Sequence, residues 1–335
     1  MKENSHPPIP SRRRRKNPTA LLPTTEVLRG CFVDFLNLEV ASGDAAPDTV
    51  TTYRRRISDY LSWCAAKGIS PALATPEDVK AYRHYLIKER GQKPATIALT
   101  LLVIRRFYGA AVTKGLVRDN PALGVKPPRD KVDAAERLTY LEEGELRQLL
   151  ASLPHEGSLK SWRDLALIGI MALQGPRTVE LHRANFGDLL RSGDNWGLRV
   201  EGKGSIRTVP LRPDLAEVLW QYLKAREAAG EVLTPESPLF VAVGNRFGGQ
   251  RLSRRGIRWI VDQYLAASGL KHANGRTLSA HSLRHTAGTL GLRAGADLRQ
   301  IQDLLGHKDP KTTALYAHVS ERHANNPALA IDVEI

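Results

Sequence analysis

The sequence predicts a mainly α-helical fold of two domains: a four-helix N-terminal domain, then an α-rich domain that contains a small antiparallel β-sheet. Three observations predict it. Apolar residues recur at helical spacing through most of residues 25–320. A segment with three prolines in thirteen residues, 119–131, interrupts this pattern. One stretch, 196–211, has β-forming residues on both sides of a Gly-Lys-Gly turn and predicts a hairpin.

The first domain, residues 25–118, is predicted from four amphipathic stretches. The third stretch begins with Thr75 as N-cap, Pro76 at the first helical position and two acids in the first turn. The second stretch carries an apolar stripe at spacings of three and four, formed by Val50, Tyr53, Ile57, Tyr60 and Cys64.

The charge of the chain predicts a polyanionic partner. Its 335 residues include 49 Lys and Arg against 35 Asp and Glu, a net charge of +14. Residues 1–130 alone hold 22 basic and 12 acidic side chains. Such a field favours nucleic acid first and an acidic membrane surface second. We expect DNA contacts from basic pairs and triplets on two helices of the first domain: Arg54, Arg55, Arg56, Arg105 and Arg106.

Residues 1–24 are predicted to form a disordered basic arm. Three prolines precede a run of five cations: Arg12, Arg13, Arg14, Arg15 and Lys16. We expect this arm to add non-specific affinity for DNA. The alternative is a tail that only aids solubility.

Composition argues against a secreted or membrane protein. Two cysteines are too few for a disulfide scaffold or a four-cysteine zinc site. The longest apolar run, residues 165–173, is too short to cross a bilayer. The N-terminus lacks the apolar core of a signal peptide. We therefore expect a cytoplasmic, nucleoid-associated protein with no membrane partner.

The second domain is predicted over residues 137–320, after a linker at 119–136. A capping box at 139–142 is expected to open its first helix. A buried helix around 162–174 and the hairpin follow. Further helices are expected at 213–228, 253–267, 282–293, 297–305 and 310–318.

Three fragments of this domain place polar residues within apolar helices, and Lys203 occupies the hairpin turn. Arginine forks can hold two oxygens of a phosphodiester, a lysine or histidine can move protons, and a tyrosine can act as a covalent nucleophile. No acidic cluster is available to hold magnesium, so the arginines would replace a metal, and we expect no metal or cofactor. The fragments are GPRTVEL with Arg177 and Glu180, HSLRHT with His281, Arg284 and His285, and LLGHKDPKTTALYAHV with His307 and Tyr316.

Four motifs, QGPRTVEL, GKGSIRTVPL, HSLRHT and IQDLLGHKDPKTTALYAHV, resemble in order and spacing those of the tyrosine recombinases, the phage integrase family with its Xer members. The resemblance covers about residues 25–320. It implies a SAM-like core-binding domain at 25–118 and a catalytic tyrosine recombinase domain at 137–320. It also implies site-specific cleavage and rejoining of DNA through a 3′-phosphotyrosyl intermediate and a Holliday junction. Integration and excision, transposition, and chromosome or plasmid resolution all remain open.

By the same resemblance, three residues bind the scissile phosphate and a fourth supports them. Arg177 and Arg284 match the two arginines that clamp it. His307 matches the histidine that bonds a phosphate oxygen, and Glu180 matches the acidic residue that supports and orients the site.

Three residues are matched to the chemical step. Tyr316 matches the nucleophile, His281 the histidine that assists proton transfer at the tyrosine, and Lys203 the lysine that protonates the leaving 5′-oxygen. Two departures from the family pattern stand out. Pro176 precedes the first arginine, where it fixes φ and removes a donor, and the hairpin is one residue shorter than usual.

Other functions are weighed against this one. A type IB topoisomerase-like enzyme would use the same nucleophile on any duplex. A DNA-binding protein without catalysis would not need all seven polar positions. His281 and His285 have a zinc-like spacing but lack the glutamate of the zinc-protease motif. Tyr316, taken alone, could be an ordinary core tyrosine.

The expected partner is double-stranded DNA with inverted-repeat core sites. We expect a monomer in the free state and a homotetramer on two duplexes, and a second recombinase or accessory protein remains open. The tail, 321–335, is expected to exchange between protomers. Its last six residues, AIDVEI, alternate apolar and acidic side chains as a strand does.

Overall fold

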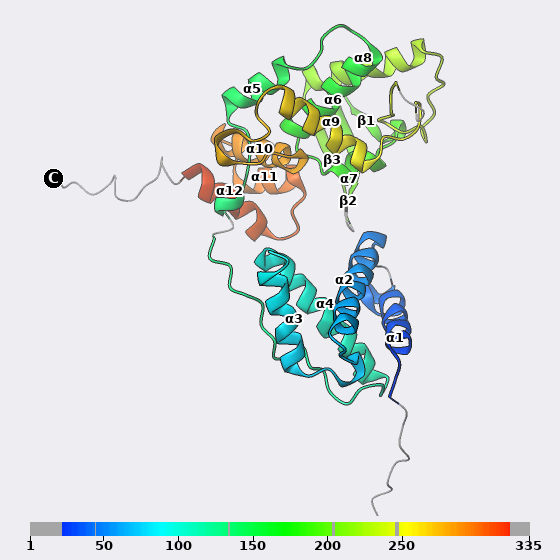
Figure 1. Cartoon of the computed structure of the whole chain (residues 1–335). Helices are drawn as coiled ribbons and strands as arrows, with labels where there is room; N and C mark the ends of the chain where they lie inside the picture. The colour runs from blue at the N-terminus through cyan, green and yellow to red at the C-terminus, as the bar shows by residue number, and fades with distance from the viewer. Residues whose placement is uncertain (1–21, 44, 133–134, 203–204, 245–247, 322–335) are drawn as a thin grey trace, which may run out of the picture. The chain divides into compact units, whose positions relative to one another are not determined.

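The computed structural model describes residues 22–43, 45–132, 135–202, 205–244 and 248–321. The chain forms two compact units, unit 1 over Met1–Lys131 and unit 2 over Val132–Ile335 (Figure 1). The cationic run of the predicted arm, Lys203 and the tail beyond Glu321 lie outside the described residues.

Unit 1 contains four α-helices in its described part. Three of them begin with proline, whose missing N–H costs nothing at the first helical position. The predicted N-cap Thr75 accepts a hydrogen bond from the backbone N–H of Asp78. The helices are α1 (Thr25–Leu38), α2 (Pro47–Ala66), α3 (Pro76–Lys88) and α4 (Pro94–Thr113).

Helix α4 is the core helix of unit 1 and packs against α1, α2 and α3. Its length and hydropathy would suffice to cross a membrane, but half of that apolar window is buried inside the unit. Ile97, Leu101 and Ile104 are at most 1% exposed. The apolar character of α4 is therefore that of a core helix in a four-helix domain.

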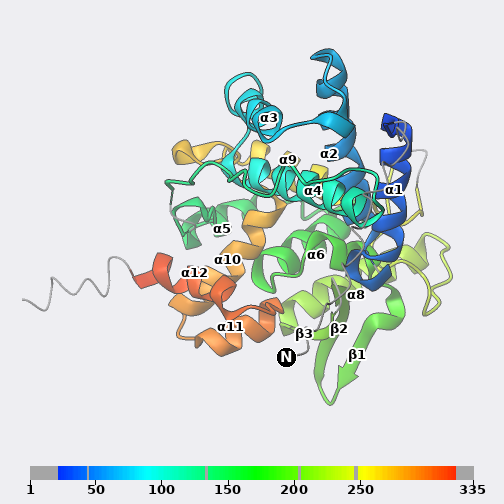
Figure 2. The same cartoon turned by 90° about the horizontal axis from the view of Figure 1, so that it is seen from below.

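Unit 2 is built from helices and one small sheet. Helix α6 is central and packs against α8 and α10 (Figure 2). The helices are α5 (Glu143–Ala151), α6 (Leu159–Leu173), α7 (Thr178–Arg183), α8 (Pro213–Ala228), α9 (Arg254–Ala267), α10 (Ala280–Arg293), α11 (Leu298–Leu305) and α12 (Pro310–Glu321).

The sheet has three antiparallel strands in chain order, β1 (Leu189–Ser192), β2 (Asn195–Gly202) and β3 (Ser205–Leu211). The predicted hairpin is confirmed, with Gly202 paired to Ser205 at its closed end. Strand β1 was not predicted, because its four residues are mostly exposed and carry no apolar alternation. The turn itself lies outside the described residues.

The capping box predicted at 139–142 is wrong. Helix α5 begins at Glu143, and its capping box is formed by Glu142 and Glu145. The hydroxyl of Thr139 instead lies 2.8 Å from that of Ser282 on α10, and the N–H of Leu141 donates to Thr286. Residues 139–141 thus tie the start of unit 2 to α10. The expected N-cap, Thr139, lies three residues before the observed one, because Glu142 also fits the acidic position that closes a capping-box motif.

Candidate active site

The polar motifs of unit 2 meet where α10, α11 and α12 pack together (Figure 1). Helix α10 carries His281, Arg284 and His285, and α12 carries Tyr316. Gly306 ends α11 in the left-handed conformation, with φ at 63°. This turn directs the chain through His307 into α12.

The C-terminus of α11 holds three arginines from three different elements. Arg207 on β3 donates from Nε to Leu304 O at 3.3 Å, and Arg284 on α10 donates from Nη2 to Leu305 O. Arg177, the N-cap of α7, donates from Nη2 to Gly306 O at 3.1 Å. The last carbonyls of a helix lack intrahelical partners and form the negative end of its dipole. Three consecutive carbonyls therefore offset the repulsion among these cations.

Glu180 is fully buried and joins two of the arginines. It accepts 2.8 and 2.6 Å bonds from Arg177 Nη1 and from the Arg177 backbone N–H. Arg207 donates two more, at 2.6 and 3.0 Å. Burial acts to raise the pKa of Glu180, but the bonds to Arg207 and Arg177 outweigh it and hold the pKa below its usual value. A side chain at Gly202 would meet Glu180 Oε1 at 2.9 Å, so this strand end requires glycine.

Arg284 is 2% exposed and is fixed by backbone oxygens. Besides Leu305 O, it donates from Nη1 to Gly175 O, after the end of α6. Burial first, and then the charge of Arg177, lower the pKa of Arg284 to about 9. It remains a cation at neutral pH, and these two carbonyls use two of its five N–H groups.

Tyr316 is 1% exposed, and its ring packs on α10. A Cβ on Gly288 would lie 2.9 Å from the ring, so α10 admits the tyrosine because this residue is glycine. The ring of His307 stacks on it at a centroid distance of 5.9 Å. Tyr316 Oη lies 2.9 Å from His285 Nδ1. Burial raises the pKa of Tyr316 to about 12, although the charges of Arg284 and Arg177 act to lower it.

The three histidines are uncharged at neutral pH. Burial and neighbouring positive charge lower the pKa of His285 to about 3 and that of His307 to about 4. The same two causes lower the pKa of the more exposed His281. His307 Nδ1 lies 2.9 Å from Thr313 Oγ1, and the rings of His281 and His285 meet edge to face at 4.4 Å.

A cationic recess of about 410 Å³ opens beside these groups, between the N-terminal ends of α7 and α10 and one side of α9. Arg177, Arg254, Arg258 and His281 line it, together with Asp262. Guanidinium groups and the positive end of α10 are suited to a phosphate oxygen. The recess therefore joins Arg177 and His281, two of the residues predicted for the site.

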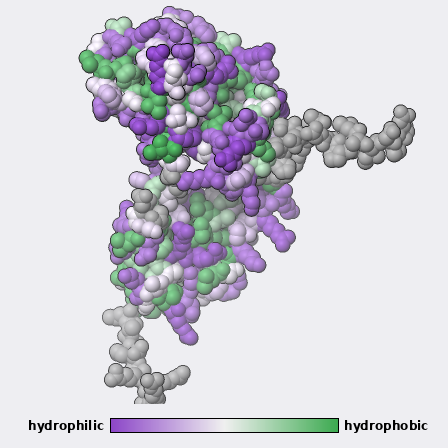
Figure 3. All heavy atoms as spheres, turned by 180° about the vertical axis from the view of Figure 1, so that it is seen from behind, coloured by the Kyte–Doolittle hydropathy of each residue, from purple (hydrophilic) through white to green (hydrophobic). Residues whose placement is uncertain are grey.

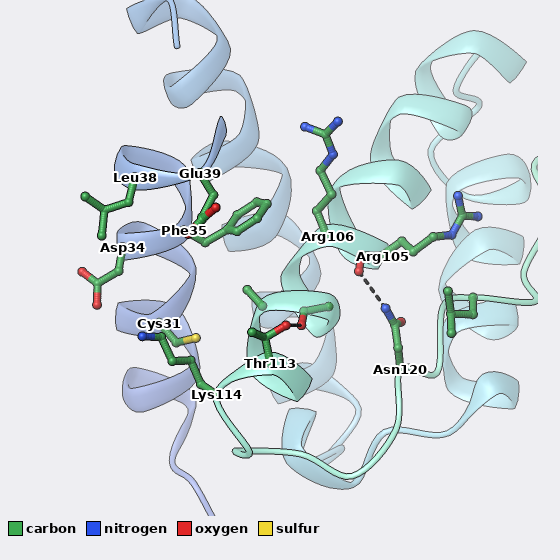
Figure 4. Close-up of a pocket in the computed structure, with 13 residues that line it drawn as sticks. Cys31, Asp34, Phe35, Leu38, Glu39, Arg105, Arg106, Thr113, Lys114 and Asn120 are labelled. Carbon is green, nitrogen blue, oxygen red and sulfur yellow. Dashed lines mark hydrogen bonds between the residues drawn. The ribbon is translucent and has the colours of Figure 1, made fainter. Parts of the chain in front are cut away.

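A larger cavity, about 500 Å³, lies in unit 1 between α1 and α4 (Figure 4). Apolar side chains such as Phe35 and Leu38 contribute much of its lining. Burial raises the pKa of the Cys31 thiol there, which favours the inert protonated form. Arg105 and Arg106 line this cavity, but no histidine or tyrosine does, so it lacks the combination of groups found in unit 2.

The predicted DNA-binding arginines of unit 1 differ in what they contact. Arg54 and Arg55 on α2 are exposed, and Arg106 lies over the ring of Tyr53 at 5.6 Å. Hydrophilic side chains are widespread on the face of the protein drawn in Figure 3. Arg56 is half-buried. Arg105 is also half-buried and donates to Ala122 O and Val125 O, so it also holds the segment after α4.

Sequence reasoning missed functional candidates on β3 and α9. Arg207 was present in the quoted motif GKGSIRTVPL, but only the contact with Glu180 reveals its importance. Helix α9 exposes Arg255, Arg258 and 60% of Trp259. The run SRRGIRW was a readable signal, since arginines beside an exposed aromatic ring are typical of nucleic-acid surfaces.

Among the described residues, no group of three His, Cys, Asp or Glu side chains could hold a metal ion. The site chemistry available is that of cations, neutral imidazoles and a phenol. Such a set can bind a phosphodiester, offset charge as it develops, and supply a nucleophile with a nearby proton acceptor.

Comparison with known families identifies the family of the chain. A model of the phage integrase family matches residues 139–323, and a model of its N-terminal SAM-like domain matches residues 35–116. The chain belongs to the phage integrase family. The resemblance drawn from the four motifs is thereby confirmed, and with it DNA strand cleavage and rejoining as the activity of a tyrosine recombinase.

Relatives of the family align along most of the chain. The tyrosine recombinase XerC of Pelotomaculum thermopropionicum is 32% identical over 297 residues, which cover 86% of this chain and 92% of the relative. XerC of Corynebacterium efficiens is 33% identical over 292 residues, which cover 87% of this chain and 86% of the relative.

Solved structures of the family share the fold. XerH bound to palindromic difH substrate, in a post-cleavage complex, matches with a TM-score of 0.73 at 18% identity, over 93% of this chain and 98% of that one. A lambda integrase dimer bound to a COC′ core site matches with a TM-score of 0.65 at 20% identity, over 87% and 97%. The predicted fold class, mainly α with a small antiparallel sheet, is confirmed.

Proposed function

We propose that this integrase-family protein cuts DNA at specific sites with Tyr316, forming a 3′-phosphotyrosyl bond and a free 5′-hydroxyl. The observation that carries the proposal is the convergence of the Tyr316 ring, the Arg284 guanidinium and His307 at the junction of α10, α11 and α12. The phosphotyrosyl bond conserves the energy of the broken phosphodiester, so rejoining needs no nucleotide cofactor.

Arg177 and Arg284 bind the non-bridging oxygens of the scissile phosphate. Both are held by carbonyls at the end of α11, so their positions are set before DNA arrives. Glu180 holds Arg177 through two hydrogen bonds. His307 lies next to this cluster and bonds a phosphate oxygen.

Lys203 is the acid that protonates the leaving 5′-oxygen. It lies outside the described residues, but the strands on either side of it pair to their ends at Gly202 and Ser205. Gly202 also approaches Glu180, which brings this end of the hairpin close to the arginine cluster.

DNA is contacted by both units. In unit 1 we assign Arg54, Arg55, Arg56, Arg105 and Arg106, and in unit 2 the exposed face of α9. A basic arm at residues 12–16 adds sequence-independent affinity for DNA. Core-binding residues 25–118 and catalytic residues 137–320 would then grip one core site together, joined by a linker at 119–136.

The active assembly is a homotetramer on two duplexes with inverted-repeat core sites, formed from free monomers. Strand exchange through a Holliday junction requires four nucleophiles, and residues 321–335 of each protomer couple it to its neighbour. A lambda integrase tetramer bound to a Holliday junction shares the fold, with a TM-score of 0.61 at 20% identity. The reaction serves a mobile element or chromosome resolution, in the cytoplasm at the nucleoid.

A nicked suicide substrate tests the proposal. Cleavage near the nick releases a short strand and traps the covalent complex. Wild type should give an adduct that maps to Tyr316, and Tyr316→Phe should bind DNA normally and trap nothing. The matched control is Tyr264→Phe, which removes a half-buried phenol bonded to Asp164 in the same unit and should still trap DNA.

An adduct on another residue, or one that persists in Tyr316→Phe, would reject the assignment. Exchange between two duplexes that carry bound sites separates recombination from a topoisomerase-like activity. An enzyme of the second kind would relax supercoiled DNA as a monomer and exchange nothing.

A further inference from the structure

His285 lies on α10, one turn after His281, and faces Tyr316. Its Nδ1 is 2.9 Å from Tyr316 Oη, a normal hydrogen-bond distance. The two ring centroids are 5.7 Å apart. The motif match assigned proton transfer at the tyrosine to His281, but the side chain that reaches the phenol oxygen is that of His285.

His281 is placed for a different contact. It lines the cationic recess with Arg177 and Arg258, whereas His285 is not part of that lining. The rings of the two histidines touch edge to face. They therefore divide the site, with His281 on the phosphate side and His285 on the phenol side.

The nucleophile needs a base at this position. Burial raises the pKa of Tyr316 to about 12, so at neutral pH only about one molecule in 10⁵ carries a phenolate. His285 is half-buried and uncharged, because burial and the charges of His281, Arg284 and His307 lower its pKa to about 3. In the tautomer that carries its proton on Nε2, the neutral imidazole directs its Nδ1 lone pair at the phenol O–H.

We propose that His285 is the general base that removes the proton of Tyr316 during DNA cleavage. This inference rests on the proposed function of Tyr316. As the Oη–P bond forms, the Oη–H bond breaks and the proton moves to His285 Nδ1. The P–O5′ bond breaks at the same phosphorus, and the 5′-oxygen takes a proton from the acid, Lys203. Rejoining runs the same transfers in reverse.

The bound phosphate itself strengthens this base. Without DNA, the charges of Arg284 and the neighbouring histidines oppose a proton on His285. A phosphodiester clamped by Arg177 and Arg284 brings a negative charge that offsets theirs. His285 therefore becomes more basic when the scissile phosphate is in place.

The test uses two substitutions that differ in one property. His285→Asn keeps a hydrogen-bond acceptor near the position of Nδ1 but cannot take a proton, and His285→Ala removes both. Single-turnover cleavage of the suicide substrate should slow by about 10²–10⁴-fold in both variants, because that is the usual contribution of a general base. DNA affinity should change by less than about threefold. The control His272→Asn alters an exposed histidine of unit 2 and should cleave at the wild-type rate.

A second measurement separates a base from a merely structural residue. Replacing Tyr316 by a fluorinated tyrosine supplies a more acidic phenol that needs less help to ionise. The rate ratio of wild type to His285→Ala should then shrink by at least about tenfold. Added imidazoles should also restore cleavage in His285→Ala, with rates that rise with the basicity of the imidazole.

The proposal would be overturned if His285→Asn cleaved DNA at the wild-type rate. It would also be overturned if His285→Ala slowed cleavage by the same factor with tyrosine and with fluorinated tyrosine at position 316. Neither result would bear on the assignment of Tyr316 as the nucleophile, because its covalent adduct is measured separately in the wild-type protein. Failure of that adduct would instead reject the proposed function.

Discussion

Arg207 donates two hydrogen bonds to Glu180, at 2.6 Å to Oε1 and 3.0 Å to Oε2. The same carboxylate accepts the backbone N–H and the guanidinium of Arg177. Because Glu180 is fully buried, it needs these cations to stay ionised. Arg207 thus positions Arg177 through a carboxylate between them, and strand β3 is coupled to the proposed phosphate clamp.

Arg207→Gln should slow cleavage by about 10²-fold, since small displacements of a clamp are this costly. The fall in DNA affinity should be smaller, because many other phosphate contacts remain. Single-turnover cleavage and a binding titration measure the two effects. Arg199→Gln is the matched control on the adjacent strand, where the arginine is exposed and pairs with Asp188.

Stability distinguishes positioning from collapse of the fold. Removal of Arg207 leaves Arg177 as the remaining cationic partner of the buried Glu180, and should cost up to about 3–5 kcal/mol of unfolding free energy. The double variant Arg207→Gln/Glu180→Gln removes the under-compensated charge and should recover much of that stability while cleavage stays slow. Recovery of cleavage in the double variant, or wild-type cleavage by Arg207→Gln alone, would argue against the positioning role.

Gly306→Ala should disturb the site beyond its backbone cost. A Cβ there would lie 2.7–2.9 Å from Arg207 side-chain atoms, at the hub where three arginines meet. The control is Gly269→Ala, at a similar φ of 73° but with nothing within 4 Å. Both variants lose about 1 kcal/mol to left-handed strain, measured by urea unfolding. Only Gly306→Ala should also slow cleavage. Equal cleavage rates in the two variants would show that the close contact between Gly306 and Arg207 is not needed for the reaction.

The helices and the hairpin were predictable because each depends on local patterning. Proline at the first position and an apolar stripe mark α2 and α3 without reference to the rest of the chain. The start of α5 was misplaced because Glu142 fits a capping box either as its third helical residue or as its N-cap. Strand β1 was missed because its pairing with β2, not its own residues, makes it a strand.

The site was predictable only as a set of motif positions. Which histidine faces Tyr316 depends on how α12 docks on Gly288 of α10, a contact across 28 residues that no spacing rule encodes. The partnership of Arg207 with Glu180 likewise joins residues of β3 and α7. Long-range side-chain pairing of this kind is settled by packing and not by local sequence.

Arg177→Ala and Arg284→Ala should affect chemistry more than binding. A donor aimed at developing charge is worth about 10²–10³ in rate, whereas one phosphate contact among many changes affinity modestly. Arg55→Ala provides the contrast, since Arg55 is exposed on α2. It should weaken binding and leave cleavage at saturating protein unchanged. The prediction fails if the clamp variants lose affinity in proportion to rate.

Deletion of residues 1–20 should weaken binding to any DNA sequence. Five cations lie at 12–16, and each phosphate they neutralise contributes about −0.9 to the slope of log K against log salt. The slope should therefore flatten by several units while the preference for the core site persists. Titrations at a series of salt concentrations, on specific and scrambled DNA, measure both. An unchanged slope would show that the arm does not take part in DNA binding.

Stability should fall as pH drops below about 6.5, because two histidines are held neutral. The pKa of His307 in the folded protein is about 4, lowered by burial and by Arg284, Arg177, Arg207 and His281. The pKa of His285 is about 3. Unfolded histidines titrate near 6.5, so between about 6.5 and 4 the unfolded chain binds more protons than the folded chain.

Each of these two histidines therefore contributes a slope of up to about 1.4 kcal/mol per pH unit within this window. Glu180 acts lower, because its pKa is depressed below 4.5 and its contribution is lost only as pH falls through the folded value. Urea unfolding at about pH 7 and pH 5 measures the histidine range alone, because both values lie above the range of Glu180. His307→Asn should flatten the slope between them, whereas the exposed His272→Asn should leave it unchanged. A wild-type slope in His307→Asn would mean that His307 carries its proton in the folded protein.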